Sequence, residues 1–241
     1  FAEKSNGHYI LNGTKNWVSN GISSDLVIVF ALTTKGIGYK GVSAFCVEKG
    51  TPGLTTGKKE EKLGIRGSDT CELYFENCKV PVENLIQEEG SGFHIAMKAL
   101  DGGRIGIGAQ AVGIAQASLD RALEYSKERK QFGKPISSFG AIKSKLAQMA
   151  TNIEASRLLV LRAAALKDNH QPYTKEAAMG KLFASQTAMD AARECVQIFG
   201  GYGYMQEYGV ERLMRDAKIT QIYEGTSEIQ ELVIARTILE E

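Results

Sequence analysis

The chain has 241 residues, of which 43% are apolar and 24% are charged. This length accommodates two domains, and the balance is typical of folded globular proteins. It excludes a disordered tail, a collagen-like fibre and a disulfide-stapled miniprotein. The formal net charge of +1 lacks the basic excess of nucleic-acid-binding proteins, so no nucleic-acid partner is expected. No apolar run approaches the roughly 20 residues of a membrane-spanning helix, so no membrane span is expected.

The four cysteines, Cys46, Cys71, Cys78 and Cys195, form no CxxC pair and have no histidine at metal-ligand spacing. They are predicted to be buried free thiols in a reducing compartment, and no metal site is expected. The three histidines lie far apart in the sequence, which argues against a catalytic triad. The first residue is Phe1 rather than Met, which indicates a processed chain or a fragment, and no signal or transit segment is visible in it.

Residues 1 to 87 have the pattern of an antiparallel β region. The dipeptides Asn6-Gly7, Asn12-Gly13 and Asn20-Gly21 predict turns, because both residue types tolerate positive φ. Short apolar segments rich in β-branched and aromatic residues predict the strands between them. These segments are Tyr9 to Leu11, Leu26 to Leu32, Val42 to Val47 and Glu72 to Phe75.

Residues 88 to 241 have a helical period instead. Two apolar stripes with alternating steps of four and three predict long helices over 142–163 and 178–199. A third helix is predicted over 105–129, ending before Gly133 and Pro135. A fourth is predicted over 227–239, where Ser227 and Gln230 have the spacing of a capping box. The sequence therefore predicts a β domain over residues 1–87 and a helical bundle over residues 88–241.

Two short segments could carry chemistry. The glycines of residues 103–108 are similar to a nucleotide-binding loop, but they lack the preceding strand and the full spacing, so close helix packing is the preferred interpretation. In the segment 222–229, Glu224 precedes a glycine and the start of a helix, where backbone can approach a ligand closely. An exposed loop glutamate is the alternative.

Six segments, in order along the chain, identify the sequence as resembling the acyl-CoA dehydrogenase family, closest to its short-chain, butyryl-CoA branch. They are NWVSNG from Asn16, KLGIRGS from Lys62, LDGGR from Leu100, ERKQFG from Glu128, QIFGGYG from Gln197 and YEGT from Tyr223. The resemblance implies an α+β multidomain fold, with part of a middle antiparallel β domain followed by a C-terminal four-helix bundle. It also implies that the family's N-terminal helical domain is missing from this chain.

The resemblance further implies an FAD-dependent oxidoreductase that converts an acyl-CoA, expected to be short-chain, to its trans-2-enoyl-CoA. Glu224 resembles the base that removes the α-proton, the hydride passes to flavin N5, and electron-transfer flavoprotein accepts the electrons. The backbone N–H of Glu224 and a flavin hydroxyl would hold the thioester carbonyl, in the manner of an oxyanion hole. Such a protein is placed in the cytoplasm of a bacterium or the mitochondrial matrix of a eukaryote.

Contacts are implied position by position. The residues that resemble cofactor contacts are Trp17, Val18, Ser19, Arg129, Phe132, Gln197, Ile198, Phe199, Gly200, Gly201, Thr226, Ser227 and Glu228. Those that resemble substrate contacts are Asp101, Gly102, Gly103, Arg104, Tyr223 and Gly225. Arg129 resembles an arginine that grips the FAD pyrophosphate of a neighbouring subunit, which implies a dimer of dimers with shared FAD sites. One departure is Gly140, where relatives often carry a glutamine that contacts flavin.

Other interpretations stay open at this point. Arg104 could be a salt-bridge residue of helix packing, Arg129 could stabilise the end of its own helix, and Trp17 could belong to the β-domain core. At the level of function, the alternatives are an acyl-CoA oxidase that uses oxygen and a flavin-free module that only oligomerises.

Overall fold

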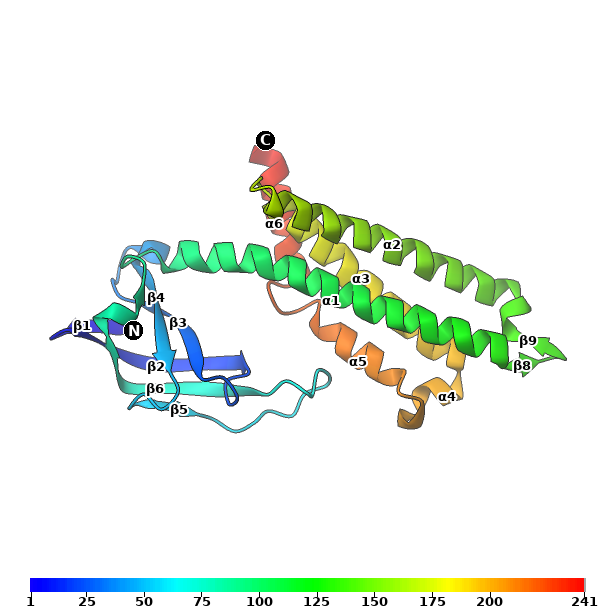
Figure 1. Cartoon of the computed structure of the whole chain (residues 1–241), viewed down its shortest axis with the longest axis horizontal. Coiled ribbons are helices and arrows are strands. Elements are labelled where there is room, and N and C mark those ends of the chain that lie inside the picture. The colour runs from blue at the N-terminus through cyan, green and yellow to red at the C-terminus, as the bar shows by residue number, and fades with distance from the viewer. Residues whose placement is uncertain (241) are drawn as a thin grey trace. The chain divides into compact units, whose positions relative to one another are not determined.

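The computed structural model describes residues 1–240. The chain forms two compact units, one of residues 1–62 with 66–99 and one of residues 63–65 with the chain from residue 100 onward. Antiparallel sheets make up the first unit and helices the second, as predicted (Figure 1). Helix α1 (Gly92–Glu128) contributes its first turns to the β unit and the rest to the helical unit. The domain boundary predicted between residues 87 and 88 stays a prediction.

The β unit contains two antiparallel sheets. In the first, the strand order is β1 (Ala2–Ser5), β2 (His8–Ser19), β6 (Thr70–Pro81) and β5 (Leu54–Thr56); in the second, it is β3 (Leu26–Leu32), β4 (Val42–Glu48) and β7 (Leu85–Ile86). Buried side chains of both sheets form one core, in which the rings of Tyr9 and Phe45 meet edge to face with centroids 4.9 Å apart. The four predicted strands are confirmed, and β1, β5 and β7 were not predicted.

The predicted turns have different outcomes. Asn6 and Gly7 have positive φ values of 43° and 79° and close the β1–β2 hairpin, and Asn20 opens a turn after β2. The turn predicted at Asn12-Gly13 is wrong, because these residues lie inside β2 at a shift in its register against β6. The Asn12 side chain accepts a hydrogen bond from the backbone N–H of Asn77 on β6 at 2.7 Å, which bridges the irregularity and keeps the strands paired.

The helical unit is a bundle around one apolar core. Its long helices are α1, α2 (Gly140–Asp168) and α3 (Thr174–Phe199), followed by the short helices α4 (Gly201–Tyr204) and α5 (Glu211–Ile219) and by α6 (Ser227–Glu240). A small hairpin of β8 (Lys130–Gln131) and β9 (Lys134–Pro135) joins α1 to α2. The three long helices and α6 were predicted, although α1 begins at Gly92, well before the predicted start at residue 105. Helix α5 also packs on this core, where it places Met214 and Ala217 in the apolar cluster, and it was not predicted.

Small residues let the bundle helices approach closely. Residues 103–108 lie inside α1, so they form no nucleotide-binding loop. A Cβ at Gly108 would lie 2.8 Å from Cγ2 of Val160 on α2, which confirms a packing role for this glycine. Gly106 differs, because a Cβ there would have no neighbouring atom within 4 Å.

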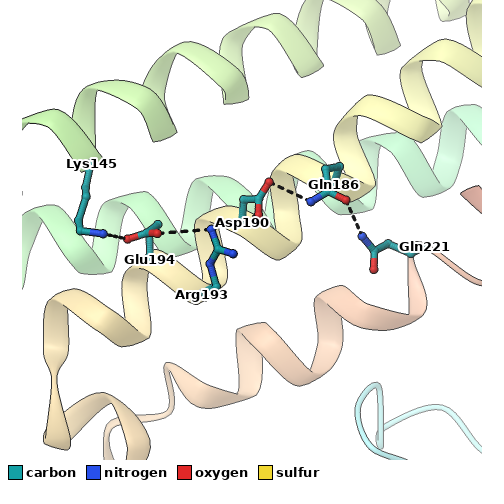
Figure 2. Close-up of polar contacts among 6 residues, drawn as sticks. All are labelled: Lys145, Gln186, Asp190, Arg193, Glu194 and Gln221. Atoms are coloured by element: carbon teal, nitrogen blue, oxygen red, sulfur yellow. Dashed lines mark hydrogen bonds and ion pairs between the residues drawn. The ribbon is translucent and has the colours of Figure 1, made fainter.

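A polar network runs along α3, from α2 to the segment after α5 (Figure 2). Lys145 of α2 pairs with Glu194 of α3, and Gln186 of α3 accepts a hydrogen bond at 3.0 Å from Gln221 in the segment after α5. Between these points, Arg193 pairs with Glu194 at 3.5 Å. These groups are partly exposed, so each pair contributes little free energy of folding by itself. Together they connect α3 to α2 and to the segment that leads to Glu224.

Candidate active site

The connection between α5 and α6 carries two consecutive residues in the left-handed region. Glu224 has φ 55° and Gly225 has φ 90°. This conformation costs little for glycine but is unfavourable for a glutamate, and such strain tends to persist only where surrounding contacts hold it. The contacts of this connection with α1, α3 and α6 within the helical unit supply that restraint.

The carboxylate of Glu224 lies against Gly103 of α1. A Cβ at Gly103 would overlap Oε2 of Glu224 and lie 2.9 Å from its Cδ, so the absence of a side chain at Gly103 makes room for the carboxylate. Glu224 is half-buried, and desolvation raises its pKa, while the charges of Arg104 and Lys181 oppose the rise. The interpretation of Glu224 as an exposed loop residue is therefore wrong.

Arg104 forms a buried ion pair next to this carboxylate. Its side chain is 5% exposed and contacts Asp101 one turn away on α1 at 2.5 Å. Asp101 also accepts a hydrogen bond from the hydroxyl of Thr174 at 2.7 Å. The interpretation of Arg104 as a salt-bridge residue is thus confirmed by its ion pair with Asp101. Nε of Arg104 is nevertheless buried without a partner among the described residues, so the pair leaves one donor for another acceptor.

Two buried residues that sequence reasoning missed hold the Glu224 connection. Nζ of Lys181 on α3 donates to the carbonyl oxygen of Gly225 at 2.6 Å, and Nε2 of Gln230 on α6 donates to the same oxygen at 2.8 Å. Both side chains are fully buried. Lys181 lies one turn from Ala178 and Ser185 in the apolar stripe of α3, and a lysine inside such a stripe is the signal that could have found it.

The start of α6 corrects the predicted capping box. The hydroxyl of Thr226, not that of Ser227, accepts the capping hydrogen bond, from the N–H of Ile229 at 3.4 Å. Gln230 uses its amide on the connection rather than on the helix cap. Thr226, Ser227 and Glu228 therefore lie within one turn of Glu224. Tyr223, on the other side of Glu224, donates its hydroxyl hydrogen to Gln110 of α1.

A second group of predicted residues lies at the far end of α1. A cavity of about 460 Å³ is lined by Tyr125, Arg129, Gln131, Ile136, Ile198, Phe199, Gly200, Gly201, Tyr202 and Met205. The guanidinium of Arg129 lies 5.6 Å from the centroid of the Tyr202 ring, and within residues 1–240 it has no carboxylate at ion-pairing distance. Phe132 is 90% exposed in the adjacent β8–β9 hairpin, and Gln197 lies just before the lining residues in α3.

The two groups are far apart within the unit. From Gly103 to Glu128, α1 rises by roughly 37 Å at 1.5 Å per residue. The structure therefore brings Asp101, Arg104 and the residues 223–228 together, and it brings Arg129 together with residues 198–201, but it does not join these two groups in one chain. Gly140 begins α2, and a Cβ there would meet no atom within 4 Å.

The remaining predicted site residues lie in the β unit. Trp17, Val18 and Ser19 end β2, where its register against β6 shifts. The side chain of Trp17 is 70% exposed, and its φ is 56°. The interpretation of Trp17 as a residue of the β-domain core is therefore wrong.

The four cysteines are free; Cys71, Cys78 and Cys195 are buried, and Cys46 is partly exposed. Across residues 1–240, His, Cys, Asp and Glu side chains form no group of three that could hold a metal ion. Within the same residues, every helix is too short or too polar to span a membrane.

Comparisons with known proteins identify related sequences and structures. Residues 90–239 match the family model of the acyl-CoA dehydrogenase C-terminal domain, and residues 1–78 match that of the middle domain. An acyl-CoA dehydrogenase of Bacillus subtilis is 57% identical over 99% of this chain and 63% of its own length. The chain thus spans about 60% of the length of the curated relatives it matches.

Two solved structures share the fold closely. Butyryl-CoA dehydrogenase from Megasphaera elsdenii is 55% identical, with a TM-score of 0.98 over 99% of this chain and 62% of its own. A chain in a structure of the electron transferring flavoprotein of Acidaminococcus fermentans is 53% identical, with a TM-score of 0.98 over 100% of this chain and 63% of its own. With both domain models matched in order over nearly its whole length, this chain belongs to the acyl-CoA dehydrogenase family.

Proposed function

We propose that the full-length protein is an FAD-dependent dehydrogenase that converts a short-chain acyl-CoA to the trans-2-enoyl-CoA, with Glu224 as the α-proton base. One observation carries the proposal: the half-buried carboxylate of Glu224, held against Gly103 on a strained connection beside Arg104. The relatives named as acyl-CoA dehydrogenases, including the butyryl-CoA enzyme, support the substrate class.

The residues explain how a carboxylate can act on a weak carbon acid. Burial raises the pKa of Glu224, which makes it a stronger base than an exposed glutamate. The left-handed turn at Glu224 and Gly225 fixes the direction of the Glu224 N–H, the proposed donor to the thioester carbonyl. A hydrogen bond to that oxygen stabilises enolate character and acidifies the α-carbon. Asp101 and Arg104 would orient the acyl-CoA, with Nε of Arg104 as an available donor.

The dehydrogenases of this family are FAD flavoproteins. Several residues of this chain have the chemistry to bind groups of FAD. Arg129 offers a guanidinium without a carboxylate partner among the described residues, beside a cavity whose rim includes Gly200 and Gly201. Such a planar donor suits a pyrophosphate. When bound, FAD supplies the acceptor for the hydride from the β-carbon. We propose Trp17, Val18, Ser19, Phe132, Gln197 and residues 226–228 as further cofactor contacts.

The distance along α1 supports a shared site. Arg129 and the Glu224 group lie roughly 37 Å apart along the helix, so one cofactor does not bridge them within one chain. We therefore propose that Arg129 serves the flavin of a neighbouring subunit in a dimer of dimers. Exposed apolar side chains on the helical unit, among them Leu158, Leu161 and Leu232, are compatible with such an assembly.

Electron-transfer flavoprotein is the proposed acceptor, and similarity to a chain in the Acidaminococcus structure supports it. The bacterial cytoplasm or the mitochondrial matrix is the proposed compartment.

The flavin spectrum of the full-length protein tests this function. We expect a bound flavin band that is bleached anaerobically by butyryl-CoA faster than by palmitoyl-CoA. Equal or faster bleaching by palmitoyl-CoA would contradict the short-chain assignment. Reoxidation by electron-transfer flavoprotein without peroxide is expected, whereas peroxide in proportion to substrate would identify an oxidase. Absence of flavin from the correctly assembled protein would favour an oligomerisation module.

A further inference from the structure

The buried lysine of α3 suggests a role that the proposed mechanism does not use. Lys181 is 0% exposed, and its Nζ donates to the Gly225 carbonyl at 2.6 Å. Lysine is rarely buried completely, and an apolar side chain of similar volume often gives equal or greater stability at such positions. The contacts of the ammonium group indicate what it does at this position.

The carbonyl that Lys181 holds belongs to the connection that carries Glu224. Gln230 donates to the same oxygen at 2.8 Å and to the Glu224 carbonyl at 3.3 Å. A carbonyl fixed from α3 and from α6 cannot rotate without losing both donors, and its peptide follows directly on the left-handed residues Glu224 and Gly225. The two side chains therefore restrain the left-handed backbone conformation of Glu224, which an unrestrained glutamate would rarely adopt.

We infer that Lys181 is a positioning residue for the proposed reaction: with Gln230 it fixes the left-handed turn that presents the carboxylate and the backbone N–H of Glu224. This inference rests on the proposed function of Glu224. It gives Lys181 two effects on the base, one geometric, through the Gly225 carbonyl, and one electrostatic, through its charge.

The charges around Lys181 determine the expected pH effect. Arg104 of α1 faces it with like charge, while Glu224 of the connection and Glu228 of α6 face it with opposite charge. On α2, Lys167 lies beside Gly102, since its Nζ would be 3.3 Å from a Cβ there. Because the charge of Lys181 lowers the pKa of Glu224, its removal makes the base titrate at higher pH.

The test uses the full-length flavoprotein with the substitution Lys181→Met. Methionine has a side chain of similar length but lacks the N–H donors and the charge of the ammonium group. We expect normal flavin content, assembly and acyl-CoA affinity, with kcat lower by roughly 100-fold, because small misplacements of a reacting group have effects of this size. The acidic limb of kcat/KM should move upward by roughly half a pH unit or more. In a crystal structure of the variant, the Glu224 carboxylate should be displaced from Gly103.

Three further variants make the test decisive. Lys181→Arg should recover part of kcat and return the acidic limb towards its original pH, and Gln230→Met should lower kcat in the same direction. Lys79→Met, at an exposed position of β6, is the matched control and should change neither kcat nor the acidic limb.

Unchanged kcat, acidic limb and Glu224 position in Lys181→Met would overturn the inference. Should that variant fail to assemble, an unchanged kcat in Gln230→Met would overturn it.

Glu224→Gln separates the two proposals. Loss of turnover in Glu224→Gln with unchanged behaviour in Lys181→Met refutes only the positioning role. Retained turnover in Glu224→Gln refutes the proposed base and the inference with it.

Discussion

The Glu224 carboxylate fills the space that a side chain at Gly103 would take. The position of the base can therefore be tested by substitution at both residues. A carboxylate at residue 103 would start on α1 where the Glu224 carboxylate now ends. A base could therefore reach this space either from residue 224 or from residue 103. The chain has glutamate at 224 and glycine at 103, so we expect it to use the first arrangement alone.

Moving the carboxylate should therefore restore part of the activity. Glu224→Gly should abolish turnover, and addition of Gly103→Glu should recover a measurable fraction of kcat, because the new side chain enters the space that Glu224 vacated. Gly106→Glu in the same background is the control, since Gly106 is exposed on α1. Equal recovery by the control variant would show that the restored activity does not depend on the position of the carboxylate.

Lys181 should also leave a signature in the pH dependence of stability. Burial lowers its pKa from 10.5 to about 8 in the folded protein, so the unfolded chain binds more protons between these values. The contribution of Lys181 to the free energy of unfolding therefore increases as the pH rises from about 8 to 10.5, by roughly 3 kcal/mol at most. Relative to Lys181→Met, the wild-type midpoint of thermal unfolding should increase over this window. Parallel pH profiles would contradict a charged lysine at this position below pH 8.

Single residues differ in how visible they are in the sequence. Glu224 could be found because it lies in a recognisable segment before a glycine and a helix start. Lys181 stands out only as a lysine in the apolar stripe of α3. The contacts of Lys181 and Gln230 could not be predicted, because their acceptor is a backbone oxygen that any residue carries, and for Lys181 it lies 44 positions away. The exposure of Trp17 was equally hidden, since a tryptophan in a strand-like segment fits a core as well as a surface.

At the scale of elements, alanine substitutions at two glycines of α1 should change the free energy of unfolding differently. Gly106→Ala should raise the free energy of unfolding by about 0.5–1 kcal/mol, because alanine favours a helix and no atom is close to the new Cβ. Gly108→Ala should lack this gain, because its Cβ would lie 2.8 Å from Val160. Urea unfolding of both variants measures the difference, and Val160→Ala should restore the gain at residue 108. Equal effects of the two alanines would contradict the close approach of α1 and α2.

The elements that were predicted are those with long, regular patterns. The stripes of α2 and α3 extend over many turns, so their period is unambiguous. Helix α5 has nine residues and no predicted cap, and β5 and β7 have three and two residues, which is too short for a period to show. Asn12-Gly13 failed for another reason: a turn dipeptide can also form a bulge when the partner strand continues past it.

At the scale of the whole molecule, the separation of the two residue groups predicts complementation between subunits. Arg129→Ala should lose flavin on dialysis, because a guanidinium on pyrophosphate makes hydrogen bonds worth about 1.5–3 kcal/mol each. Arg162→Ala, at an exposed arginine of α2, is the control. Mixed assemblies of Arg129→Ala and Glu224→Gln subunits should regain activity, since one of the two shared sites then carries neither change. Normal flavin retention in assembled Arg129→Ala, or inactive mixed assemblies, would contradict a shared site.

The central claim is that Glu224 removes the substrate proton, and rapid-mixing reduction of the flavin by butyryl-CoA tests it most directly. Full-length wild-type protein and Glu224→Gln are loaded with equal flavin, shown to bind butyryl-CoA with similar affinity and mixed with it anaerobically. The wild-type flavin band should bleach within the time of one turnover. The band of Glu224→Gln should persist, with a rate lower by several orders of magnitude, because an amide cannot accept the α-proton. Bleaching of Glu224→Gln at a rate close to that of the wild type would contradict the assignment.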